Sequence, residues 1–142
     1  MRALPRSADF EDVPTNVLAT LGSLVRAPAI VVGMTTPLAD VRKLLAQRRI
    51  PAVAVVDDAH DLRGIITRTD VLRSPDGVAG DVMSGFVFAL PADASIERAA
   101  ALMAYEGVGQ IVVTDRDGVL VGMVSALDIT RHYALESGYL AE

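Results

Sequence analysis

The chain has 142 residues, of which 51% are hydrophobic and 22% are charged, proportions that are typical of one globular module. Its net charge of −5 and its single lysine argue against a nucleic-acid partner, because such proteins neutralise phosphates with clustered basic side chains. The lack of cysteine excludes disulfides and thiolate sites, and two histidines are too few for a zinc site without carboxylate help.

The first residues predict a mobile leader at 1–15 and no targeting signal. The stretch "MRALPRSADFEDVP" lacks the long apolar region of a signal peptide. No apolar run in the chain approaches the roughly 18 residues that a membrane span needs. We therefore expect a cytoplasmic protein with no membrane partner.

The chain repeats itself after 58 residues, so that "GIITRTDVLR" at 64–73 corresponds to "GMVSALDITR" at 122–131. The same offset carries Leu38 to Ile96 and Val55 to Val113, with the apolar character kept. Self-similarity at a fixed period indicates a repeated structural unit. We predict one repeat at 16–78 and a second at 79–142, which together form one globular module.

Each repeat begins with the same two predicted elements. Short apolar runs at 29–32 and 86–90 predict buried strands. A helix follows each strand, with Thr36 and Pro37 expected to cap the first helix and Asp93 or Ser95 the second. The apolar side chains on one face of these helices are Leu38, Val41, Leu44 and Leu45 in the first copy, and Ile96, Ala99, Ala100 and Met103 in the second.

A hairpin and a final helix complete each predicted repeat. The β-branched runs "IPAVAVVD" and "VGQIVVTD" end in turn residues, and further strands follow at 63–67 and 120–125. The order is β-α-β-β-α, and a unit of this size is marginal alone. We expect an α/β (α+β) fold of tandem repeats related by pseudo-two-fold symmetry, with two small sheets packed together and helices outside.

The two repeated motifs place a hydroxyl and an aspartate at the start of the final helices. Thr67 precedes Asp70 by three residues, and Ser125 precedes Asp128 by the same spacing. This is the spacing of a capping box, in which each side chain bonds to the other residue's amide. The same position suits a ligand, because a helix N-terminus attracts phosphate and a carboxylate accepts bonds from a sugar diol. Both interpretations remain open.

Taken together, these features resemble the paired CBS domain, or Bateman module, over residues from about 16 to 135. The resemblance depends on "DVM" at 81–83, the "VVD" and "VTD" strand ends, the duplicated order of elements and the two G-h-h-[ST]-x-x-D motifs. It implies a regulatory module that holds AMP, ADP, ATP or S-adenosylmethionine in clefts between the repeats, as a regulatory ligand and not as a cofactor. It also implies homodimers formed through the helices.

The resemblance implies that the Ser or Thr of each motif binds phosphate and that its Asp binds ribose. It also implies that adenine is held by the chain that enters the first strand of the opposite repeat. Thr67 and Asp70 would then face 83–88, and Ser125 and Asp128 would face 25–30. The residues implied by these stretches are Met83, Phe86 and Phe88 for the first site and Val25 and Ile30 for the second, with Pro51 and Gly109 where the second strands begin. The alternative is that Val25, Ile30, Phe86 and Phe88 are core residues.

The sequence departs from the family pattern at the phosphate. Many nucleotide-binding members carry a basic residue early in the second strand, where this chain has Ala52 and Gln110. Arg68 follows Thr67 and could compensate, whereas the second copy has Ala126 at that position. We therefore favour the Thr67 and Asp70 site for an anionic ligand, and an adenosine-like or weakly charged ligand for the other.

Two other classes of function compete with ligand binding. Ser125, Asp128 and His132 could form a catalytic group, but no G-x-S-x-G nucleophile elbow is present, so we predict no enzyme and no catalytic residue. "DRDG" lacks the later glutamate of a calcium loop, and no metal site is predicted. The competing hypothesis is a ligand-free scaffold for dimerisation or docking to an effector protein, which a mean hydropathy of +0.39 favours.

Overall fold

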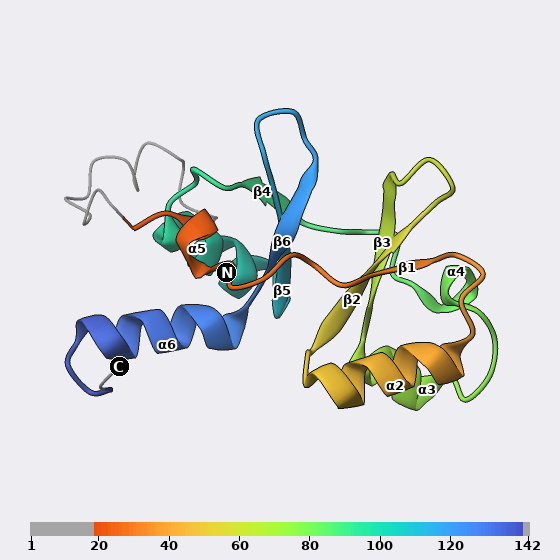
Figure 1. Ribbon diagram of the computed structural model, residues 1–142. Helices are drawn as coiled ribbons and strands as arrows, with labels where there is room; N and C mark the ends of the chain where they lie inside the picture. The colour runs from red at the N-terminus through yellow and green to blue at the C-terminus, as the bar shows by residue number, and fades with distance from the viewer. Residues whose placement is uncertain (1–18, 141–142) are drawn as a thin grey trace. The chain divides into compact units, whose positions relative to one another are not determined.

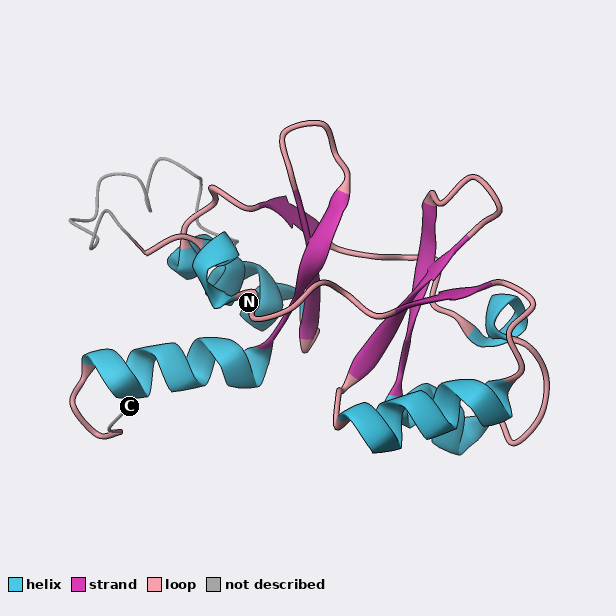
Figure 2. Cartoon of the chain, in the orientation of Figure 1, coloured by secondary structure: helices cyan, strands magenta, loops and turns pink. Residues whose placement is uncertain are grey.

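The computed structural model describes residues 19–140, which form two three-stranded sheets with helices beside them (Figure 1). These residues divide into two compact units. Unit 1 contains residues 19–28 and 88–140, and unit 2 contains residues 29–87. The mixture of helices and strands in each unit (Figure 2) confirms the predicted α+β fold class.

Unit 2 contains a mixed sheet in the order β1-β2-β3, with β1 parallel and β3 antiparallel to β2. Helices α2 and α3 lie beside each other next to this sheet (Figure 1). The strands are β1 (Val31–Gly33), β2 (Ala52–Val56) and β3 (Leu62–Thr67), and the helices are α2 (Leu38–Arg48), α3 (Arg68–Arg73) and α4 (Ala79–Val82). The central strand β2 is buried along its whole length.

Unit 1 repeats this arrangement with the sheet order β4-β5-β6, in which β4 is parallel and β6 antiparallel to β5. The strands are β4 (Ala89–Pro91), β5 (Gln110–Thr114) and β6 (Leu120–Ser125), and the helices are the 3-10 helix η1 (Leu21–Leu24), α5 (Ile96–Glu106) and α6 (Ala126–Glu136). Both predicted hairpins are therefore confirmed, as β2-β3 and β5-β6.

Each unit is completed by a short segment from the other sequence repeat. In unit 1, the amides of Leu21 and Gly22 donate to the carbonyls of Ala94 and Ala92, each at 2.8 Å. In unit 2, at the equivalent positions, the amide of Ala79 donates to Thr36 at 2.8 Å and that of Gly80 to Met34 at 2.7 Å. The compact units therefore do not coincide with the repeats at 16–78 and 79–142. The predicted leader at 1–15 lies outside the described residues.

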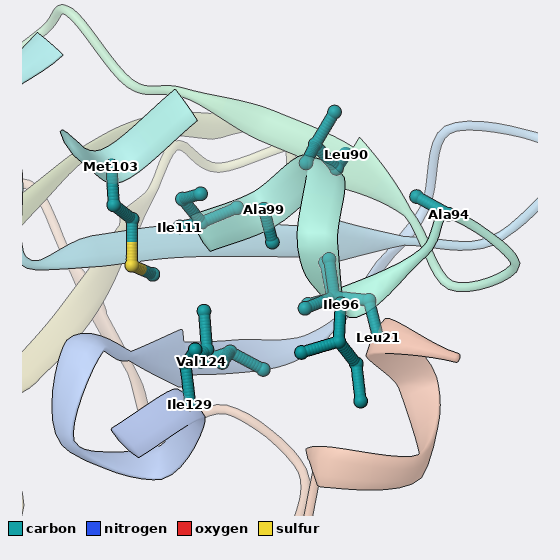
Figure 3. Packing of buried hydrophobic residues seen from close by; sticks show 10 residues of the cluster. Leu21, Leu90, Ala94, Ile96, Ala99, Met103, Ile111, Val124 and Ile129 are labelled. Carbon is teal, nitrogen blue, oxygen red and sulfur yellow. The ribbon is translucent and has the colours of Figure 1, made fainter. Parts of the chain in front are cut away.

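The buried apolar side chains form one cluster in each unit. Figure 3 shows the unit 1 cluster, in which Leu21 packs with residues of β4, α5, β5, β6 and α6. Leu21 is fully buried there, although it belongs to the first sequence repeat. In unit 2, Leu38, Val41 and Leu45 of α2 are buried against β2 and β3. The predicted helix faces are confirmed, with Leu44 and Ala100 only half-buried at their edges.

The predicted cap of α2 by Thr36 is wrong. Of the two caps predicted for α5, Asp93 or Ser95, the structure has Ser95. The N-cap of α2 is Pro37, and no side chain within residues 19–140 caps this helix. The hydroxyl oxygen of Thr36 instead accepts the amide of Gly33 at 3.1 Å, because the Leu38 amide that begins the helix already donates to the carbonyl of Gly77 at 2.9 Å. Ser95 caps α5 by accepting the Arg98 amide at 3.1 Å.

Two predicted strands start later than their apolar runs. Strand β1 starts at Val31 and β4 at Ala89, although the runs begin at 29 and 86. The residues before each strand make one further bond to the sheet, from the Ala54 amide to Ile30 and from the Val112 amide to Phe88. Within residues 19–140, no helix is both long and apolar enough to cross a bilayer.

Candidate functional site

The first motif, residues 64–70, lies where β3 turns into α3, and it forms a complete capping box. The Thr67 amide donates to Oδ2 of Asp70 at 2.8 Å, and the Asp70 amide donates to Oγ1 of Thr67 at 3.4 Å. The Thr67 hydroxyl also donates to Oδ2 of Asp70 at 3.1 Å. Both polar roles of the hydroxyl, as donor and as acceptor, are therefore used inside the motif.

The second motif, residues 122–128, repeats this geometry where β6 turns into α6. The Ser125 amide donates to Oδ2 of Asp128 at 2.8 Å, and the Asp128 amide donates to Oγ of Ser125 at 3.1 Å. Within residues 19–140 the Ser125 hydroxyl donates no hydrogen bond. The capping interpretation of both motifs is confirmed, and the second keeps one hydroxyl proton for another partner.

Among the described residues, each aspartate accepts hydrogen bonds through only one of its two carboxylate oxygens. In the part of the chain that the structure describes, Oδ1 of Asp70 and Oδ1 of Asp128 accept no hydrogen bond. Both side chains are half-buried. Because an ionised carboxylate oxygen can accept two bonds, each motif presents an orientated acceptor whose position is set by its own helix cap.

The first amide of α3 and of α6 donates to the residue just before the neighbouring strand, β2 or β5. The Arg68 amide donates to the carbonyl of Pro51 at 3.2 Å, and the Ala126 amide donates to that of Gly109 at 2.9 Å. Pro51 and Gly109 thus lie beside the motifs, and their carbonyls reduce the number of helix amides open to phosphate. The Arg68 side chain is exposed, and its Nε donates to the carbonyl of Ile50 at 3.2 Å.

The chain that enters β4 runs beside the first motif within unit 2. Ser84 and Ile65 exchange two backbone hydrogen bonds, of 3.1 and 2.9 Å. A Cβ at Gly64 would meet the carbonyl oxygen of Ser84 and would lie 2.9 Å from the sulfur of Met83. The structure thus brings Met83 to the strand that ends at Thr67, and this close approach explains why the motif has a glycine at 64.

The equivalent chain runs beside the second motif within unit 1. A Cβ at Gly122 would lie 2.5 Å from Cγ1 of Val25, so Val25 is brought to the strand that ends at Ser125. Gln110 is the direct partner of Ser125 in the β5-β6 pairing. Opposite residues of an antiparallel pair point to the same face, so the Gln110 amide and the Ser125 hydroxyl share one side of the sheet.

Three further predicted residues lie elsewhere or are more open. Ile30 belongs to unit 2 and Phe88 to unit 1, each in the other unit from the aspartate with which the sequence pairs it. Ile30, Phe88 and Val25 each pack at the edge of their own unit's core. This packing supports the interpretation of Ile30, Phe88 and Val25 as core residues. Phe86 is 77% exposed, so the core interpretation is wrong for that residue.

His132 contacts its own helix neighbours. Its Nε2 lies 3.6 Å from Oε1 of Glu136, and its ring meets that of Tyr133 edge-on with 5.4 Å between centroids. Burial raises the pKa of Tyr133, with Glu97 and then Glu136 adding to the effect. The Ser125 oxygen accepts a hydrogen bond from the Asp128 amide, which is a donor and not a base. The described contacts of His132 are with Glu136 and Tyr133, and not with Ser125.

Known proteins and structures are similar to this chain over most of its length. The protein MK0525 of Methanopyrus kandleri is 27% identical over 118 residues, which cover 78% of this chain but only 60% of that protein. The CBS domain pair of protein MJ0100, solved with 5′-methylthioadenosine and S-adenosyl-L-methionine, has a TM-score of 0.76 at 22% identity, covering 83% of this chain and 98% of that one.

A second solved structure agrees with the first. The CBS domain protein PAE2072 of Pyrobaculum aerophilum, complexed with AMP, has a TM-score of 0.76 at 20% identity, covering 84% of this chain and 97% of that one. The CBS domain family model matches this chain twice, at residues 21–77 and 79–135. This chain therefore belongs to the CBS domain family and carries two CBS domains in tandem.

Proposed function

We propose that this CBS pair is a regulatory sensor that binds an adenosine-containing ligand at its two motifs. The observation that carries the proposal is the free Oδ1 of Asp70 and of Asp128, each held by a capping box at a half-buried strand end. A carboxylate oxygen in that position is a suitable acceptor for the two hydroxyls of a ribose. The ligands of the MJ0100 and PAE2072 structures, which include S-adenosyl-L-methionine and AMP, support this ligand class.

The two motifs offer different groups to the rest of the ligand. Beside Asp128 stand the free hydroxyl proton of Ser125 and the amide of Gln110, which suit adenosine or a weakly charged compound. Beside Asp70 the Thr67 hydroxyl is occupied, and Arg68 keeps the N–H groups other than Nε for an anionic group. We therefore propose the first motif for a phosphate-bearing ligand such as AMP and the second for a neutral or cationic adenosine compound such as S-adenosylmethionine.

The proposal includes a homodimer in the cytoplasm that passes ligand occupancy to an effector protein. The ligand acts as a signal and not as a cofactor, and no reaction is assigned to the chain. A ligand that binds only the folded state stabilises it by RT ln(1 + [L]/Kd). Ligand binding thereby stabilises the folded state. An effector protein that binds the ligand-bound and ligand-free forms with different affinity would respond to this occupancy.

Titration calorimetry and thermal unfolding with AMP, ATP, adenosine and S-adenosylmethionine test the proposal. A ligand at a hundred times its Kd should raise the free energy of unfolding by about 2.7 kcal/mol. Asp70→Asn and Asp128→Asn keep an oxygen for the cap but remove the charge, and each should abolish binding at its own motif. Asp58→Asn, an exposed acid in the β2-β3 turn, is the matched control and should bind as the wild type does.

One observation favours a second candidate function, a ligand-free scaffold. Both capping boxes are complete without any ligand, so the motifs also have a purely structural role. If none of the four compounds stabilises the wild type, the scaffold replaces the sensor. If stabilisation survives in the Asp70→Asn and Asp128→Asn double variant, the ligand binds elsewhere and the site assignment is wrong.

A further inference from the structure

The two motifs share the capping-box geometry but differ in the charges beside them. At three positions next to the first motif the chain has arginine, and at the equivalent positions 58 residues later it has an acid or an uncharged residue. Two of these positions lie at the end of the long helix α2 or α5, and the third begins α3 or α6. The pairs are Arg48 and Glu106, Arg49 and Gly107, and Arg68 and Ala126.

The structure brings the side chain of Arg68 to the turn that contains Arg49. The Arg68 Nε donates to the carbonyl of Ile50 at 3.2 Å, and the Arg68 amide donates to that of Pro51 at 3.2 Å. Arg49 directly precedes these two residues. The turn between α2 and β2 therefore holds Arg68 through its backbone and through its side chain, beside the capping box of the first motif.

The two arginines keep their positive charge open to a ligand. The ion pair found in residues 19–140 joins His132 to Glu136 in the other unit, so among these residues Arg49 and Arg68 have no acidic partner. Both arginine side chains are exposed. Arg68 uses only its Nε within the described chain, and its Nη groups keep their N–H donors. A guanidinium binds a phosphate through two parallel hydrogen bonds.

Arg49 has a backbone conformation that glycine adopts with less strain. Its φ is 52° and its ψ is 43°, and Gly107 has a φ of 68° and a ψ of 31° at the equivalent C-cap. A side chain is disfavoured in this left-handed region. A basic residue at a helix C-terminus recovers part of that cost, but the second repeat ends α5 with Glu106 and Gly107. The helix end alone therefore does not require an arginine.

We propose that Arg49 and Arg68 together form a phosphate subsite at the first motif, while Asp70 binds the ribose. This inference rests on the proposed function and identifies the residues that select a phosphate-bearing ligand there. The family pattern has its basic residue early in the second strand, where this chain has Ala52. The positive charge comes instead from the turn before that strand and from the helix that follows the hairpin. The second motif lacks both arginines and selects its ligand by the nucleoside alone.

The affinities for AMP and adenosine test the subsite, because the two compounds differ only in the phosphate. Calorimetry in the Asp128→Asn background confines binding to the first motif. There Arg49→Gly and Arg68→Gln should each raise the Kd for AMP roughly tenfold or more, the effect of losing a charge-assisted hydrogen bond. Neither should change the Kd for adenosine. Added salt should weaken the binding of AMP and leave that of adenosine unchanged.

His60→Gly is the matched control for Arg49→Gly. His60 also has a positive φ, of 64°, and its equivalent in the second repeat is Gly118. It lies in the β2-β3 turn, at the opposite end of the hairpin from Thr67. Both substitutions should leave the Tm unchanged or higher, because relief of steric strain offsets the greater flexibility of glycine. Only Arg49→Gly should weaken AMP binding, a combination that a merely structural residue would not give.

The outcomes separate this inference from the ligand proposal. If adenosine binds and Asp70→Asn abolishes its binding, the ribose site stands. A ratio of AMP to adenosine affinity that either arginine substitution leaves unchanged then overturns the phosphate subsite alone. Equal losses of both compounds also overturn it, since the arginines would then only support the fold of the motif. If the wild type binds neither compound, the proposed function fails and the subsite fails with it.

Discussion

The glycine at the start of each motif is set by a close approach between two chain segments. Gly64 faces the carbonyl of Ser84, and Gly122 faces the side chain of Val25. In both cases the strand that ends in the motif is crossed by the segment leading to the other repeat. A side chain at either glycine would push that segment away and move the adjacent Met83 or Val25. The close approach at each glycine therefore also sets the position of Met83 or Val25 beside the motif.

Gly64→Ala should destabilise the protein by about 1–3 kcal/mol, the usual cost of overpacking, because its new methyl group meets a backbone oxygen that cannot rotate aside. Gly33→Ala is the matched control, since its nearest neighbour would be Oγ1 of Thr36 at 3.8 Å, and it should be neutral or slightly stabilising. Urea denaturation compares the two. Equal stabilities for both variants would show that the Ser84 segment yields without cost.

The capping boxes show which parts of the site the sequence could predict. Their spacing alone identified Thr67, Asp70, Ser125 and Asp128, because a cap is a local interaction within four residues. The use of helix amides by Pro51 and Gly109 could not be predicted, since it depends on the pairing of β2 with β3 and of β5 with β6. The donation of the Thr67 hydroxyl to Asp70, which has no counterpart at Ser125 among the described residues, could not be predicted either, because the two motifs have the same spacing.

At the scale of elements, the period of the apolar residues and the turn residues predict the long helices and the hairpins. They do not predict the two short helices, η1 and α4. Helix η1 and helix α4 have four residues each, too few to show a period. They form because their amides bond to the other repeat, which is a tertiary effect. The N-cap of α2 was mispredicted for the same reason, since the Gly77 carbonyl satisfies the amide that Thr36 was expected to serve.

Loss of a cap should be measurable separately from loss of ligand binding. Ser125→Ala removes the acceptor of the Asp128 amide and should lower the free energy of unfolding by about 1 kcal/mol, as typical cap deletions do. Ser125→Thr keeps the hydroxyl oxygen and should restore most of that stability. Guanidinium denaturation followed by circular dichroism compares the three proteins; an alanine variant as stable as the wild type would contradict the structural role of this cap.

At the scale of the whole molecule, the two repeats exchange short segments. Residues 19–28 belong to the first repeat but fill the core of unit 1, and residues 79–87 belong to the second but lie in unit 2. Leu21 is the clearest case, because it is fully buried among side chains of the second repeat. Neither repeat therefore contains all of the residues that its own sheet requires.

Leu21→Ala should lower the free energy of unfolding by about 2–5 kcal/mol, the range for a leucine deleted from a packed core. Val119→Ala, at a 58% exposed position, should change it by no more than about 0.5 kcal/mol. Thermal unfolding by calorimetry measures both. A loss below 1 kcal/mol for Leu21→Ala would mean that unit 1 is stable without the exchanged segment.

The exchange also sets an order of events during synthesis on the ribosome. Unit 2 is one continuous stretch, so it can fold as soon as its last residues emerge, whereas unit 1 joins residues 19–28 to a partner surface that is translated after all of unit 2. Until β4 and α5 appear, Leu21 lacks the first of the side chains that bury it, and we expect it to stay exposed to solvent and to chaperones. We therefore expect the earliest segment that the structure describes to be secured only after all of unit 2 has been translated.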